Sequence, residues 1–258
     1  MNTFENQQQK VTEHFGSDPK EYADKYSNTT QEGYSFLSRR KRLEERLGRG
    51  TGRVLDIGCG PGVMTKQIRD LGWTYVGIDI SKEMIELAVK RFDHDSSTQF
   101  KVGPVENIEE EDNSFDVVVA MGLVEYVAND EAVIQEVKRV LKPGGLFIVS
   151  LPNWWSPVRL WDRLILKPFI YLKRRFITKK EVGVLHREYV LGSYKNLLKQ
   201  NNFEVECVDF YNFRVVPRPF DYIFPRMSIF LAGLFEPLRK VLILRNIGTG
   251  INISARLK

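Results

Sequence analysis

The stretch VLDIGCGPG, from Val54 to Gly62, decides the fold of this chain. It has the form of a short apolar strand with an acid near its end, followed by a turn with glycines at 58, 60 and 62. Glycine adopts positive φ angles readily and lets the backbone come close to a ligand. A strand that turns this tightly into a helix is typical of the nucleotide site of a doubly wound α/β sheet.

Two acids indicate what kind of ligand this turn binds. Val63 stands where the dinucleotide pattern G-x-G-x-x-G requires a small residue, and the carboxylate of Asp56 favours an ammonium group over a pyrophosphate. Asp79 ends the next apolar stretch, 17 residues after Gly62. An acid at the tip of a second strand is placed to accept both hydroxyls of a ribose. Together these features predict a cofactor that contains adenosine.

Strands and helices alternate through the middle of the chain, which predicts an α/β fold with a largely parallel sheet. The expected elements are strand 53–57, helix 63–71, strand 74–79, helix 82–92, strands 99–102 and 115–120, helix 130–141, strand 145–150, helix 190–201, strand 203–210 and a last strand in 250–258. Before them, residues 1–30 are expected to be mobile or loosely helical, and residues 34–48 to form a helix that stops at Gly48.

Four motifs in this order resemble the class I S-adenosylmethionine-dependent methyltransferases. They are the glycine turn, the acid Asp79, FDVVVAMGLVEYV at 115–127 and VLKPGGLFIVS at 140–150. Small-molecule enzymes, including the ubiquinone-biosynthesis O-methyltransferases, are the most similar members. The resemblance implies a Rossmann-like seven-stranded sheet with helices on both faces, its last strand antiparallel between strands five and six. It also implies S-adenosyl-L-methionine as the cofactor.

The resemblance implies roles for the residues around the turn. The backbone of Gly58, Cys59, Gly60 and Gly62 approaches the methionyl group, and Asp56 binds its amino group through water. An alternative is that Asp56 only caps the turn. In the family, the backbone after strand four meets the methionyl ammonium, which points to Met121, and a tyrosine before the first strand closes over the cofactor, which points to Tyr26. Packing of Tyr26 within the N-terminal segment is the alternative.

The adenosine end of the cofactor involves a second set of residues. Asp79 accepts the ribose hydroxyls, and Ile80 and Met84 are expected to press on the adenine, unless they serve only core packing. Relatives often have an acid at the position of Pro104, which cannot receive the adenine amino group. The backbone of Val105 and the side chain of Glu106 are therefore the candidates, although Glu106 is equally a solvated loop acid.

His186 is the candidate catalytic base. The stretch VLHREYVLGSYKNLL resembles a family pattern in which a histidine precedes an aromatic residue and a late helix. Transfer of a methyl group to oxygen requires loss of the hydroxyl proton, and imidazole suits that task near neutral pH. The alternative is a structural histidine at a helix start. Because no His, Cys, Asp and Glu residues have metal-ligand spacing, no metal is predicted.

Charge is distributed unevenly along the chain. The net charge of the whole chain is +5, yet residues 159–180 carry eight Lys or Arg and one acid, and residues 214–258 carry eight and two. We therefore expect an N-terminal helical extension, 1–50, and a methyltransferase domain, 51–258, with basic-aromatic insertions at 152–185 and 211–247. Both insertions leave the carboxyl edge of the sheet, so they are expected to lie over the cofactor site.

The insertions mix Trp, Tyr and aliphatic residues with Lys and Arg, which suits the headgroup region of an anionic membrane. A hydrophobic lid over a small substrate or a subunit interface is the alternative, and the oligomeric state stays open. Nucleic acid is not expected as a partner, because its binding faces are usually more polar.

These features predict a methyltransferase that acts on a lipophilic or aromatic small molecule, with oxygen as the favoured acceptor, at or near the membrane surface. The sequence contains no apolar run long enough to span a membrane, has a polar N-terminus and contains two cysteines, so a cytoplasmic protein, peripheral at the membrane, is expected. The alternative from another class is a non-catalytic scaffold that keeps the cofactor fold. A nicotinamide oxidoreductase is disfavoured by Val63 and Asp56.

Overall fold

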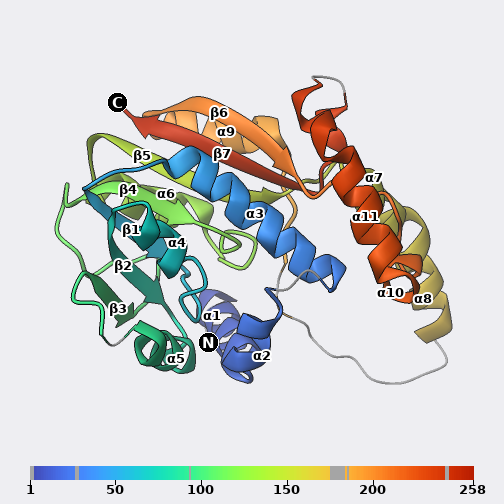
Figure 1. Ribbon diagram of the computed structural model, residues 1–258, viewed down its shortest axis with the longest axis horizontal. Helices are drawn as coiled ribbons and strands as arrows, with labels where there is room; N and C mark the ends of the chain where they lie inside the picture. Colours follow the sequence, from blue (N-terminus) through green and yellow to red (C-terminus); the bar gives the residue numbers. More distant parts are fainter. Residues whose placement is uncertain (1–2, 27–28, 93, 175–183, 185, 242–243) are drawn as a thin grey trace.

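A seven-stranded mixed sheet forms the centre of the computed structural model, which describes residues 3–26, 29–92, 94–174, 184, 186–241 and 244–258 (Figure 1). The strand order is β3-β2-β1-β4-β5-β7-β6. Only the pairs of β7 with β5 and with β6 are antiparallel. The strands are β1 (Arg53–Ile57), β2 (Thr74–Asp79), β3 (Thr98–Val102), β4 (Phe115–Ala120), β5 (Leu141–Pro152), β6 (Phe203–Tyr211) and β7 (Gly250–Leu257). The predicted fold class and the antiparallel seventh strand are confirmed.

Helices cover both faces of this sheet. Alternate residues of the central strands point to opposite faces, so Val54 and Leu55 of β1 belong to two separate apolar clusters. The cluster on the side of Val54 includes residues from α3 (Gln31–Leu47), α4 (Thr65–Asp70) and α5 (Lys82–Phe92). The cluster on the side of Leu55 includes residues from α6 (Asp130–Val140) and α9 (Leu191–Gln200). Buried β-branched and aromatic residues on both faces fix the register of the strands.

The N-terminal segment is more ordered than the sequence indicates. Residues 1–30 were expected to be mobile or loosely helical, whereas the structure has α1 (Thr3–Gly16) and α2 (Pro19–Asp24) there. The Asp18 side chain accepts the backbone N–H of Glu21 at 2.8 Å and so caps the start of α2. Both helices contact α5, and tertiary packing of this kind supplies most of the stability of short helices.

Both insertions contain helices, which the sequence analysis does not predict. The first contains α7 (Pro157–Trp161), the π-helical turn η1 (Asp162–Leu166) and α8 (Lys167–Arg174), which run on from one another. The second contains α10 (Phe220–Ile223), α11 (Pro225–Phe235) and the 3₁₀ turns η2 (Glu236–Lys240) and η3 (Arg245–Ile247). In Figure 1 these helices stand together beside the sheet, beyond one end of α3. Residues 175–183, 185 and 242–243 of the insertions lie outside the described residues.

A buried amide fastens the start of the first insertion to the end of the second. The Asn153 side chain is 3% exposed and donates to the carbonyl oxygens of Asn246 and Gly248, at 2.9 and 2.7 Å. Its oxygen accepts the Trp155 N–H at 3.1 Å. Three groups of the amide are therefore satisfied by backbone from two distant segments, which sets the positions of the insertions relative to each other.

We predict that Asn153→Ala lowers the free energy of unfolding by about 2–4 kcal/mol, because it leaves buried backbone groups without partners. Urea denaturation monitored by circular dichroism measures the change. Asn107→Ala is the matched control: Asn107 is exposed, so its replacement should change stability by less than about 0.5 kcal/mol. Equal, small effects of the two substitutions would contradict the role given to Asn153.

Candidate functional site

The glycine turn after β1 is held against the end of β2. The backbone N–H groups of Gly58 and Cys59 both donate to the carbonyl oxygen of Ile78, at 2.7 and 3.1 Å. Gly58 and Gly60 have φ angles of +69° and +52°, which other residues rarely adopt. A Cβ atom on Gly58 would also lie 2.7 Å from the Leu123 side chain. The turn therefore requires glycine at position 58 for conformation and for space.

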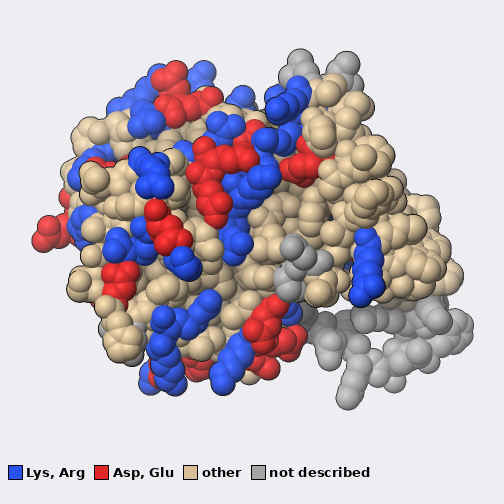
Figure 2. Space-filling view, in the orientation of Figure 1, with Lys and Arg blue, Asp and Glu red and all other residues tan. Residues whose placement is uncertain are grey.

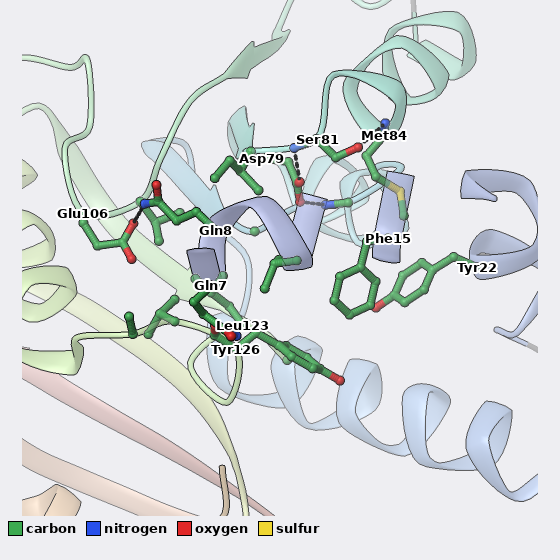
Figure 3. A pocket seen from close by; sticks show the side chains of 18 residues that line it. Gln7, Gln8, Phe15, Tyr22, Asp79, Ser81, Met84, Glu106, Leu123 and Tyr126 are labelled. Carbon is green, nitrogen blue, oxygen red and sulfur yellow. Dashed lines mark hydrogen bonds between the residues drawn. The ribbon is translucent and has the colours of Figure 1, made fainter. Parts of the chain in front are cut away.

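Asp79 connects this turn to the start of α5 (Figure 3). One carboxylate oxygen of Asp79 accepts the Gly60 N–H at 2.8 Å, and the other accepts the Ser81 N–H at 2.9 Å. Burial raises the pKa of the Asp79 carboxyl, and the N–H donors of Ser81 and Gly60 act against that change. The side chain ends β2 and lines a pocket, the position expected of an acid that accepts ribose hydroxyls.

The pocket lies where β1, β2 and β4 end, which is the usual ligand position in an open α/β sheet. Its walls combine apolar surface with two carboxylates, a composition that suits a flat heterocycle joined to a sugar. Seven of the predicted cofactor residues line it, namely Gly58, Gly60, Asp79, Ile80, Met84, Val105 and Glu106. Burial raises the pKa of the Glu106 carboxyl, and its side chain accepts a hydrogen bond from Gln8 at 3.2 Å.

The other five predicted cofactor residues, Tyr26, Asp56, Cys59, Gly62 and Met121, do not line this pocket. Asp56 is 2% exposed and accepts the Tyr75 hydroxyl at 2.8 Å, and burial raises the pKa of its carboxyl to about 7. Cys59 and Met121 are buried in the core cluster of the α3 face. Gly62 has a φ of +71° and faces aromatic side chains of α5 and β3. Contacts of these residues with the cofactor stay predictions.

The pocket has a wall that the sequence analysis missed. It is formed by α1 and α2, and its members are Gln7, Gln8, Val11, Phe15 and Tyr22. None of the described residues of the insertions lines the pocket, contrary to the expectation that the insertions lie over the cofactor site. Gln7 donates to the carbonyl oxygen of Tyr126 at 3.0 Å, and the Phe15 ring meets the rings of Tyr22 and Tyr126 edge-on (Figure 3). The spacing of Gln7, Val11 and Phe15 at four residues was the available signal.

A buried arginine adjoins the same pocket. Arg39 is 6% exposed and donates to the Tyr26 hydroxyl at 3.3 Å, and its guanidinium lies over the Phe36 ring. Nη1 of Arg39 lies so close to Gly122, which lines the pocket, that it would collide with a Cβ atom at this position. Within the described part of the chain, Nε of Arg39 has no hydrogen-bond partner. The arrangement places Tyr26 beside this cation, which itself lies against the pocket wall.

His186 is exposed, does not line the pocket and contacts Tyr126. The two rings meet edge-on with centroids 5.4 Å apart, and Tyr126 itself lines the pocket. Partial withdrawal from water and the positive charge of Arg159 lower the pKa of His186, while Glu188 acts in the opposite direction. The imidazole is therefore neutral at pH 7 and able to accept a proton.

Residues 55–149 match the family model described as a methyltransferase domain. Over 114 residues the chain is 36% identical to a ubiquinone biosynthesis O-methyltransferase from Xanthomonas oryzae pv. oryzae, which covers 43% of this chain and 47% of that protein. Over 106 residues it is 41% identical to the mitochondrial protein of that name from Mus musculus, covering 39% and 29%. The chain thus spans less than half the length of these relatives.

Solved structures agree with the fold. A SAM-dependent methyltransferase from Thermotoga maritima superposes with a TM-score of 0.65 and 19% identity, over 96% of this chain and all of that one. An S-adenosylmethionine-dependent methyltransferase from Mesorhizobium loti gives 0.58 and 18%, over 85% and 98%. Residues 55–149 form a methyltransferase domain. The resemblance to a methyltransferase is confirmed over residues 55–149, and the fold agrees with that of S-adenosylmethionine-dependent methyltransferases; S-adenosyl-L-methionine as the cofactor and methyl transfer by the whole chain are taken up below as proposals.

The residues of this domain fit the cofactor. Both oxygens of Asp79 are fixed at the pocket by backbone donors, and Gly58 and Gly60 leave space that a Cβ atom would fill. The cation of Arg39 lies next to Gly122, which lines the pocket. Among the described residues, no group of three or more His, Cys, Asp and Glu side chains is arranged to hold a metal ion.

We predict that Asp79→Ala weakens the binding of S-adenosylhomocysteine about tenfold to a hundredfold, because the ribose hydroxyls lose their acceptor inside a buried site. Isothermal titration calorimetry measures the affinity, and circular dichroism establishes that the variant is folded. Asp70→Ala, which removes an exposed acid paired with Lys66, should leave the affinity unchanged. A folded Asp79→Ala variant with the wild-type affinity would show that this acid does not hold the ribose.

Proposed function

We propose that this protein catalyses S-adenosylmethionine-dependent methyl transfer to a lipophilic or aromatic small molecule, with oxygen as the acceptor atom. The observation that carries the proposal is the pocket of the methyltransferase domain, where Asp79 fixes the glycine turn and faces the ligand space. When bound, S-adenosylmethionine supplies a methyl group already activated by the sulfonium charge. The chain then has to bind, orient and shield the reactants rather than form a covalent intermediate.

Different residues of the pocket bind, orient and shield the reactants. Asp79 and the turn at Gly58–Gly60 hold the adenosine end, and Arg39 meets the carboxylate end. Val11 and Phe15 of α1 close the pocket with apolar surface, which excludes water from the reacting groups. Orientation of two reactants in this way supplies a large part of the acceleration of a transfer reaction.

Two observations support the assignment of oxygen as the acceptor atom. The relatives reported above are named as O-methyltransferases. His186, next to Tyr126 and neutral at pH 7, is the base we assign to the hydroxyl proton of the acceptor.

The lipophilic nature of the acceptor and the place of reaction are inferred from the insertions. Their described helices expose many large apolar side chains, a surface that suits a protein meeting apolar substrates at a bilayer. No helix in the described residues is long and apolar enough to cross a membrane. We infer a cytoplasmic enzyme, peripheral at the membrane, in which Cys59 and Cys207 stay free thiols.

The experiment that tests the proposal is incubation of the purified protein with S-adenosylmethionine labelled in its methyl group and an extract of lipids and small metabolites. We expect label in organic-soluble products, identified by mass spectrometry. Bond cleavage tests with acid and with alkali distinguish methyl ethers, which resist both, from esters. Binding of S-adenosylhomocysteine with no transfer to any extract would instead favour the non-catalytic scaffold.

We predict that His186→Ala lowers kcat by about a hundredfold while the affinity for S-adenosylhomocysteine is retained, because only proton removal from the acceptor is lost. In the wild type, the rate should fall on acidification through a pKa below the usual value of histidine, and this step should vanish in the variant. His94→Ala, which changes an exposed histidine outside the pocket, is the control. Near-normal turnover of the His186 variant would leave that residue a structural role.

A further inference from the structure

The two insertions meet to form one apolar lobe, which we define as residues 154–170 and 217–235. The Arg218 guanidinium donates to the Asp162 carboxylate at 2.6 Å, and the Trp161 indole N–H donates to the carbonyl oxygen of Arg218 at 3.0 Å. These bonds join segments 56 and 57 residues apart. Figure 1 shows α7, α8, α10 and α11 side by side. The lobe is therefore one surface rather than two loops.

Large apolar side chains are concentrated on this surface. Of nineteen exposed large apolar side chains among the described residues, fourteen belong to the apolar lobe. They are Trp154, Trp155, Trp161, Leu164, Ile165, Phe169, Ile170, Phe220, Tyr222, Ile223, Phe224, Met227, Phe230 and Leu234. Figure 2 shows this side of the molecule nearly free of charged residues. Exposed apolar surface on this scale marks a site of contact with another phase or partner.

The helix α11 is turned opposite to the usual orientation. Its small residues Ser228 and Ala232 are buried, and Gln31 of α3 donates to the Ser228 hydroxyl at 2.5 Å. Three of its large residues point outward, Met227, Phe230 and Leu234, of which Phe230 is 70% exposed and Leu234 is 62% exposed. Phe235, at the end of the helix, packs against the core instead. A surface helix of a water-soluble domain normally buries its large apolar face. The outward face of α11 therefore suits contact with an apolar phase or an apolar partner surface.

The charges of the apolar lobe have one sign at its surface. Its two acids, Asp162 and Asp221, are buried and paired with Arg218 and Arg214. Lys167 and Arg226 are exposed, and neither forms an ion pair within the part of the chain that the structure describes. A partner with negative charge next to apolar material matches this pattern.

We propose that the apolar lobe docks on an anionic lipid bilayer, with its outward apolar side chains among the acyl chains and Lys167 and Arg226 at the headgroups. Tryptophan and tyrosine favour the membrane interface, and the lobe exposes four such residues, Trp154, Trp155, Trp161 and Tyr222. The inference deepens the proposed function, since it names the surface that brings the enzyme to a lipophilic substrate, but it stands on the lobe alone.

A second copy of the chain fits this surface less well. In a two-fold dimer the same patch meets itself, so the exposed cations Lys167 and Arg226 would face an equally cationic patch with no exposed acid to pair with them. The headgroups of an anionic bilayer supply the missing negative charge, and each basic residue near the surface adds to the attraction.

Co-sedimentation of the full chain with vesicles tests the proposal. We expect binding to vesicles of phosphatidylcholine with phosphatidylglycerol, several-fold weaker binding to pure phosphatidylcholine, and loss of the difference at high salt through screening. The double variant Phe230→Glu, Leu234→Glu should weaken binding to the anionic vesicles by at least about tenfold, because it places two carboxylates on the docking face. Both positions are exposed, so the fold should be retained.

The control is Val89→Glu, which changes an exposed apolar residue of α5 outside the lobe and should bind vesicles like the wild type. S-adenosylhomocysteine affinity separates the two proposals: a wild-type protein that binds anionic vesicles but not S-adenosylhomocysteine overturns the proposed function alone, and the double variant should keep the wild-type affinity because its substitutions lie outside the pocket. Equal binding by the wild type and the double variant, or none by either, overturns the docking surface. A wild-type dimer in vesicle-free solution that the double variant dissociates assigns the lobe to a second copy and likewise overturns it.

Discussion

The pair of backbone hydrogen bonds accepted by Asp79 is the constraint on which the site depends. The carboxylate holds the N–H groups of Gly60 and Ser81 at the same time, so it fixes the glycine turn relative to the start of α5. Because both oxygens are directed by backbone rather than by mobile side chains, the acceptor for a ribose is positioned before a ligand arrives. Positive φ at Gly58 and Gly60 lets the turn pass close enough for this geometry.

The rest of the molecule is arranged around that fixed point. The order of the strands reverses direction between β1 and β4, which leaves a crevice beside the turn. The helix α1 covers this crevice with Gln7, Gln8 and Phe15. The hydrogen bonds of Gln7 and Gln8 tie α1 to Tyr126 and Glu106 across the opening. The described residues of the insertions do not line this pocket.

Much of the sheet was predictable from the sequence, and the surroundings of the site were not. The bounds 53–57, 74–79 and 115–120 agree with the structure, because these runs are apolar, β-branched and bounded by turn residues. The α1 sequence is polar, and its helix depends on packing against α5 that local pattern does not reveal. The helix α11 is missing from the predicted elements because it exposes Phe230 and Leu234 and buries Ser228 and Ala232, which inverts the pattern used to recognise a helix. The Tyr75 bond that withdraws Asp56 from the pocket joins two strands and leaves no local signal.

The central claim is that the pocket between the glycine turn and α1 is the cofactor site. Hydrogen–deuterium exchange of the full chain, with and without saturating S-adenosylhomocysteine, tests it most directly. We predict slower exchange on binding in peptides that contain Gly58–Gly60, Asp79–Ser81 and α1, because the ligand fills the space that these segments enclose. Binding that leaves the exchange of all three segments unchanged, or protects only residues remote from them, would contradict the account.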